Sequence, residues 1–167
     1  MKKMTEENVK AALAVESQAH VKYAAFAEKA AAEKLPNIAR AFKANSFAEQ
    51  VHATNYVKTL GALGTTKQNL DAAVGGESFE IEEMYPAFII MAQSQGEKTA
   101  ETFFGYALAA EKVHAGIYRA ARTAVETGRD IDFKPIHVCG VCGFTIEGDA
   151  PDKCPVCGAA KAKFVTY

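Results

Sequence analysis

The sequence predicts an all-α four-helix bundle followed by a small module of β-strands and loops. Three observations lead to this fold class. Apolar residues recur at spacings of three and four through most of residues 5–127, which is the period of an amphipathic helix. Gly and Pro interrupt that pattern at a few places and divide it into separate helices. All four cysteines lie after it, in a segment of turn composition. We therefore expect a helical bundle over residues 1–134 and a metal-binding module over residues 135–167.

The composition and charge of the chain argue against several classes of function. The chain has 167 residues, 49% of them hydrophobic, and a formal net charge of −1. Since no block of like charges occurs, neither nucleic acid nor an anionic membrane surface is an expected partner. No apolar run approaches the roughly 20 residues of a membrane-spanning helix. The start Met1-Lys2-Lys3 is followed by acids rather than by the apolar segment of a secretion signal. We expect a cytoplasmic protein.

The first two helices are bounded by their capping residues. Thr5 is the expected N-cap of the first helix. Leu35-Pro36 ends it, because proline restricts the residue before it and suits the first turn of the following helix. The second helix then runs to about Leu60 and stops at Gly61. The inward stripe of the first helix reads Val9, Leu13, Glu16, His20, Tyr23 and Ala27.

A long connection and a proline shape the second half of the predicted bundle. Residues 61–77 contain four glycines and are longer than a turn between neighbouring antiparallel helices requires. We expect Ser78 to cap the third helix. Pro86 removes one backbone hydrogen bond inside that helix and should kink it near Glu83. Gly96 separates it from the fourth helix.

Two Glu-x-x-His pairs face the apolar side of the second and fourth helices. An acid and a histidine three residues apart project from one helix face. A buried carboxylate is costly unless it is compensated, and a metal ion is the strongest compensation. Di-iron and di-manganese bundles take Glu from each of two helices and Glu-x-x-His from each of the other two. The sequence therefore predicts a two-metal site. The candidate ligands are Glu16, Glu49, His52, Glu80, Glu83, Glu111 and His114.

Three further residues lie near these acids. His20 forms an i, i+4 pair with Glu16, but the ligand set is already full, so we interpret it as a core residue or a neighbour of the ligands. Tyr23 and Tyr85 have two readings. They are either core residues, or their hydroxyls hydrogen-bond a bridging carboxylate and donate protons.

The C-terminal module carries two cysteine knuckles. These are Cys139-Gly-Val-Cys142-Gly and Cys154-Pro-Val-Cys157-Gly. Two Cys-x-x-Cys motifs predict a tetrahedral thiolate site, and the glycines allow tight turns whose N–H groups face sulfur. The spacing does not choose the metal, because a structural zinc ribbon and an iron site share it. A redox-active bundle on the same chain favours iron.

On these motifs the whole chain resembles the rubrerythrins, ferritin-like di-iron bundles with a C-terminal rubredoxin-like domain. The matching segments are Glu16-Ser-Gln-Ala-His20 with Tyr23, Ala48-Glu49-Gln50-Val51-His52, Phe79 to Pro86, Ala110-Glu111-Lys112-Val113-His114 and both cysteine knuckles. The resemblance implies that Glu49 and Glu111 bridge two irons. It further implies that Glu16, with Glu83 or His52, binds the first iron, and that Glu80 and His114 bind the second. One departure is Gly140, which stands where rubredoxin knuckles often have proline.

The resemblance also implies an activity and partners. Rubrerythrins are expected to reduce hydrogen peroxide to water, with electrons passing through the rubredoxin-like iron centre from an NAD(P)H-linked reductase or a rubredoxin. Glu83, Tyr23 and Tyr85 would be the catalytic groups. A homodimer or homotetramer is expected, and the loop of residues 61–77 resembles one that exchanges helices between protomers. Two alternatives stay open: a ferroxidase that handles iron and carries a structural zinc ribbon, and a scaffold with a zinc-bound interaction module.

Overall fold

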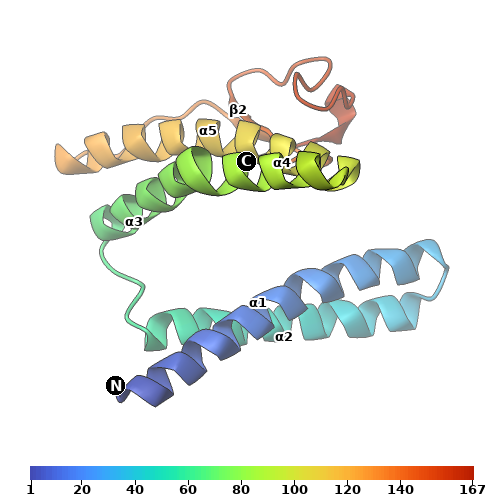
Figure 1. Cartoon of the computed structure of the whole chain (residues 1–167), viewed down its shortest axis with the longest axis horizontal. Coiled ribbons are helices and arrows are strands. Elements are labelled where there is room, and N and C mark those ends of the chain that lie inside the picture. The colour runs from blue at the N-terminus through green and yellow to red at the C-terminus, as the bar shows by residue number, and fades with distance from the viewer. The chain divides into compact units, whose positions relative to one another are not determined.

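The computed structural model describes residues 1–167 and divides into two compact units, residues 1–64 and residues 65–167 (Figure 1). The expected fold class, a helical protein with a small strand-rich C-terminal region, is confirmed. The division between the compact units is not the predicted domain boundary after residue 134, which stays a prediction. No helix combines the length and the apolar character needed to cross a membrane.

The first unit is a hairpin of two long helices, α1 (Lys3–Ala32) and α2 (Pro36–Thr59), which run antiparallel (Figure 1). As predicted, proline opens α2. The turn before it contains Lys34 at φ 62°, and the N–H of Leu35 donates to the carbonyl of Ala30 at 2.9 Å. This bond closes the C-terminus of α1. The helix begins at Lys3 rather than after Thr5, because no side-chain cap decides its start.

Small side chains let α1 and α2 approach each other closely. Ala27, Ala30 and Ala39 are buried between them. Ser46 is also buried, and its hydroxyl donates to the carbonyl of His20 at 2.9 Å. The His20 ring nitrogen Nδ1 lies 3.0 Å from the same hydroxyl and 2.9 Å from the Ser46 carbonyl oxygen. These bonds satisfy the polar groups at the helix interface, as burial requires.

The second unit begins with a helix that the sequence analysis placed too late. Helix α3 spans Thr66–Phe79, so most of the expected connection over residues 61–77 is helical. Its start is a capping box: the Thr65 hydroxyl accepts from the N–H of Gln68, and the Gln68 side chain accepts from the N–H of Thr65. Two capped orphan N–H groups outweigh the low helix propensity of Gly75 and Gly76. The prediction that Ser78 caps this helix was therefore wrong.

A π-turn, η1 (Glu80–Met84), joins α3 to α4 (Tyr85–Gln95). The N–H of Tyr85 donates to the carbonyl of Glu80, five residues earlier. Pro86 follows at the start of α4, where its missing N–H and its ring disturb the regular ladder. The sequence predicted a kink here, and the irregularity takes the form of this π-turn. After Gly96, which adopts φ 73°, α5 spans Lys98–Glu126.

The C-terminal module is a three-stranded antiparallel sheet in the order β2-β1-β3. Its strands are β1 (Ile136–Cys139), β2 (Thr145–Glu147) and β3 (Phe164–Thr166), and η2 (Lys161–Lys163) precedes β3. Strand β2 lies against α5. Gly140 continues β1 toward η2: its N–H donates to the carbonyl of Lys163 at 2.9 Å, and a Cβ at this position would lie 3.0 Å from that oxygen. The close approach of this oxygen explains why glycine stands at this position.

Candidate metal centres

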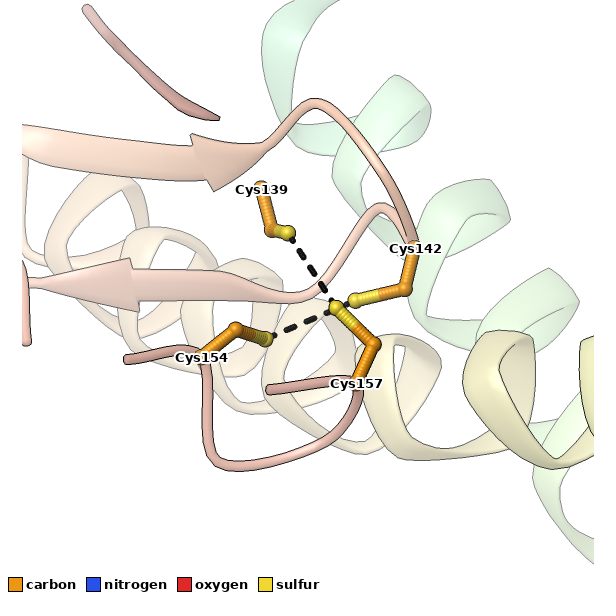
Figure 2. A group of neighbouring side chains, drawn as sticks. All are labelled: Cys139, Cys142, Cys154 and Cys157. Atoms are coloured by element: carbon orange, nitrogen blue, oxygen red, sulfur yellow. Dashed lines mark hydrogen bonds between the residues drawn. The ribbon is translucent and has the colours of Figure 1, made fainter. Parts of the chain in front are cut away.

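The four cysteines converge at one end of the C-terminal sheet (Figure 2). Cys139 and Cys142 come from the end of β1 and the loop after it, whereas Cys154 and Cys157 come from a second loop. The Sγ atoms of Cys139 and Cys157 are 3.7 Å apart, and no disulfide joins any of the four. Sulfurs about 2.3 Å from one central ion form a tetrahedron with edges of about 3.8 Å. The spacing of these sulfurs therefore fits a single tetrahedral metal ion.

Backbone N–H groups face these sulfurs, as the glycine-containing knuckles predicted. Burial raises the pKa of the Cys139 thiol, but hydrogen bonds from the backbone of Val141 and Cys142 and from neighbouring thiols outweigh burial, and its pKa falls to about 7. The backbone of Phe144 donates to Cys142 in the same way, although burial raises the pKa of that thiol. Donors aimed at sulfur stabilise thiolate, which is the form that binds a metal.

The first unit brings together Glu16, Glu49 and His52, whose candidate ligand atoms all lie within 4.8 Å of one another. His52 Nδ1 is 2.9 Å from Glu49 Oε2. A hydrogen bond with Glu49 raises the pKa of the Glu16 carboxyl, and partial desolvation raises it further. Two carboxyl groups that share a proton in this way can exchange that proton for a cation. His20 is not in this group, because its ring is hydrogen-bonded to Ser46.

The second unit brings together Glu77, Glu111 and His114, also within 4.8 Å. His114 Nδ1 is 2.6 Å from Glu111 Oε2 and 3.9 Å from Glu77 Oε2. Burial and the neighbouring Glu111 carboxyl raise the pKa of Glu77 to about 7. Glu77 Oε2 is buried and has no hydrogen-bond partner. A buried acceptor without a donor, beside a second carboxylate and an imidazole, fits a bound cation.

Glu77 was not among the ligands predicted from the sequence, whereas Glu83 was. Glu83 has an exposed side chain and does not join the group, whereas Glu80 is partly buried and near it. Burial and the negative charge of Glu111 raise the pKa of Glu80. This difference follows from the late start predicted for the third helix. With the helix starting after Thr65, Val74, Glu77 and Ile81 fall at helical spacing on the inward face.

The two tyrosines occupy different surroundings. Burial raises the pKa of Tyr85, and the negative charges of Glu80, Glu111 and Glu77 raise it further. The Tyr85 hydroxyl therefore keeps its proton at neutral pH and lies within the field of these acids. Tyr23 contacts two phenylalanine rings of the first unit, with ring centroids 6.2 Å apart in each case. The contacts of Tyr23 are those of a core residue.

The cysteine module touches the acid group of the second unit through one hydrogen bond. His114 Nε2 lies 2.7 Å from the Thr145 hydroxyl oxygen, at the first residue of β2. That hydroxyl donates to the carbonyl oxygen of Gly143 at 3.2 Å. Gly143 directly follows Cys142 in the first knuckle. A short path thus connects the cysteine cluster with a candidate metal-binding histidine.

Comparison with known proteins assigns both parts of the chain. The sequence profile of the Rubrerythrin family matches residues 7–122, and the profile described as "Rubrerythrin, rubredoxin-like domain" matches residues 137–165. Rubrerythrin-2 of Clostridium acetobutylicum is 38% identical, over 98% of this chain and 97% of its own. Nigerythrin of Nitratidesulfovibrio vulgaris is 37% identical, over 98% of this chain and 86% of its own.

Solved structures agree with this assignment. The fully reduced, all-ferrous state of nigerythrin superimposes with a TM-score of 0.56 at 35% sequence identity. The match covers 98% of this chain and 86% of the nigerythrin chain. A mixed-valence state of nigerythrin matches equally well.

Proposed function

This chain belongs to the rubrerythrin family, and from that premise we propose that it is a non-haem di-iron peroxidase that reduces hydrogen peroxide to water. The family combines a di-iron site with a rubredoxin-like four-cysteine site, and the chain has residues that fit both. The observation that supports the proposal is the contact between Thr145 of the cysteine module and His114, which is one of the proposed iron ligands.

We infer a ligand set that differs from the sequence-based one at a single acid. Di-iron bundles take ligands from four helices, so each acid and histidine group supplies half of a set. Glu77 takes the place that the sequence predicted for Glu83, since Glu77 is partly buried beside Glu111 and Glu83 is exposed. The proposed ligands are Glu16, Glu49, His52, Glu77, Glu80, Glu111 and His114.

The reaction needs two electrons and two protons for each hydrogen peroxide, and it yields two molecules of water. Iron held by these ligands would supply the electrons for cleavage of the O–O bond. The chain supplies the protons and the surroundings. Tyr85 is the proposed proton donor, because its hydroxyl remains protonated and lies near Glu80 and Glu111. Tyr23 is the proposed proton donor in the first unit, because it lies on the same predicted inward face of the first helix as Glu16.

Electrons are proposed to enter through iron in the four-cysteine site. An NAD(P)H-linked reductase or a rubredoxin is the proposed external donor. Four thiolates can bind iron as well as zinc. We favour iron, because only a redox-active metal could pass electrons to the proposed di-iron site. The Thr145 contact favours delivery to the acid group of the same unit.

We further propose that the protein works as an oligomer in which two copies exchange units. Large apolar side chains are exposed on both units, such as Phe47 at 66%, Ile90 at 67% and Phe103 at 57% of their full exposure. Exposed large apolar side chains in this number favour burial against a second copy of the chain. Each unit holds only half of a ligand set. If the first unit of one chain paired with the second unit of another, a dimer would contain two complete sites.

A single-turnover experiment tests the activity. The iron-loaded protein is reduced without oxygen and mixed with increasing amounts of hydrogen peroxide, while the red absorption of ferric iron in the four-cysteine site is recorded. We expect the colour to return in proportion to peroxide, at two electrons for each H₂O₂. The C142S variant should oxidise at the di-iron site without any colour change. Failure of the reduced wild-type protein to consume peroxide would contradict the proposal. An assembly the size of a closed shell on size exclusion would instead favour iron storage.

A further inference from the structure

Thr145 holds the only hydrogen bond to the outer ring nitrogen of His114. Its side chain is buried, at 4% exposure, although it belongs to the cysteine module rather than to the helices. The module thus reaches into the polar surroundings of the acid group. The proposed function does not require a hydroxyl at this position.

The two ring nitrogens of His114 have different partners. Nδ1 faces the carboxylates of Glu111 and Glu77, where a cation would lie. Nε2 faces Thr145. A neutral histidine that binds a metal through Nδ1 must carry its hydrogen on Nε2, and a hydrogen-bond acceptor at Nε2 selects that tautomer.

The direction of the Thr145 hydroxyl decides between the tautomers. Its own hydrogen is given to the carbonyl oxygen of Gly143 at 3.2 Å. The oxygen is therefore left to accept the Nε2–H of His114. With its hydrogen directed to Gly143, the hydroxyl offers the acceptor that the Nε2–H tautomer of His114 needs.

We propose that Thr145 is a positioning residue that fixes the tautomer and the ring orientation of His114, so that Nδ1 is available to iron. The inference rests on the proposed function, because it requires His114 to be a ligand. It has a structural consequence: a residue of the electron-carrying module prepares the di-iron site, so binding of iron by α5 depends on the docked position of β2.

Iron affinity tests the proposal with two substitutions. T145V replaces the hydroxyl by a methyl group of similar size, and T145S keeps the hydroxyl. Loss of such a partner of a metal-bound histidine typically weakens metal binding about 10- to 100-fold. In chelator competition we expect T145V to release iron from the acid site at a correspondingly lower chelator concentration. T145S should restore affinity to near the wild-type value, and the red absorption of the four-cysteine iron should persist in both.

The chain offers a matched control. Thr166 Oγ1 lies 2.9 Å from His137 Nδ1, in the same module but exposed and apart from the acid group. T166V removes an equivalent threonine–histidine bond and should leave iron binding unchanged. H114A tests the premise. If H114A holds iron as tightly as wild type, the proposed ligand set is wrong. If H114A loses iron and T145V does not, only the inference about Thr145 is wrong.

If T145V disturbs the cysteine site, the tautomer of His114 can still be measured in the wild-type protein. With zinc at all sites, nitrogen–proton correlation spectra of the histidine rings report the tautomer directly. We expect His114 to carry a slowly exchanging proton on Nε2. A proton on Nδ1 instead would overturn the proposal, as would a T145S variant that loses iron as readily as T145V.

Discussion

Replacing Glu77 by Gln should stabilise the metal-free protein and weaken the iron-loaded one. Glu77 is mostly buried, its Oε2 has no hydrogen-bond partner, and its pKa is raised to about 7 from the usual 4.5. A group whose folded pKa is raised binds its proton more tightly in the folded state. The folded protein therefore loses stability as pH rises from 4.5 to 7, and above pH 7 the full cost is present.

The size of this effect follows from the shift. A change of roughly 2.5 pH units at 1.36 kcal/mol per unit gives about 3.4 kcal/mol. Because the Glu77 carboxyl interacts with a second carboxyl, and part of its side chain reaches solvent, about 1–3 kcal/mol is the expected gain for E77Q at pH 8. The gain should shrink below about pH 5, where the wild-type carboxyl is increasingly protonated in both states. The amide keeps the shape of the side chain but carries no charge.

Thermal unfolding of chelator-treated protein at about pH 5 and pH 8 measures this gain. For a chain of this size, about 2–4 °C in Tm is expected for each kcal/mol. E82Q is the matched control, since Glu82 lies nearby in η1 with an exposed side chain; its Tm should not change. Iron loading should reverse the order of wild type and E77Q, because the amide is a poorer ligand. An E77Q protein that is no more stable than wild type at pH 8 without metal would refute the reasoning.

Three further outcomes are expected. G140P removes a backbone hydrogen bond and crowds a carbonyl oxygen, so it should destabilise the cysteine module by about 1–3 kcal/mol and speed the loss of its iron, measured by absorbance; equal loss rates would contradict this. The E49A and E111A variants can be unfolded and refolded together in equal amounts. About a quarter of the di-iron sites should be restored if two chains exchange units, and none if each chain builds its own site. Iron analysis measures the number of sites. S46A removes the α2 hydroxyl that is hydrogen-bonded to His20 of α1, and it should lower the free energy of unfolding by about 1 kcal/mol, seen as a reduced Tm.

The sequence by itself determined the chemistry of this protein. Each cysteine knuckle and each Glu-x-x-His pair is a local pattern, because a helix or a tight loop sets the spacing of residues three apart without help from the rest of the chain. For the same reason the start of α2 could be placed from Pro36, and the end of the third predicted helix from Gly96.

Tertiary structure decided what depends on contacts between distant segments. The grouping of Glu77, and not Glu83, with Glu111 depends on where α3 starts and on the π-turn that follows it. The bond between His114 and Thr145 joins residues 31 positions apart, and no periodicity predicts it. The local sequence determines which side chains lie on a given helix face. The packing of one element on another determines which of these side chains contact each other, because burial and hydrogen bonding depend on that packing.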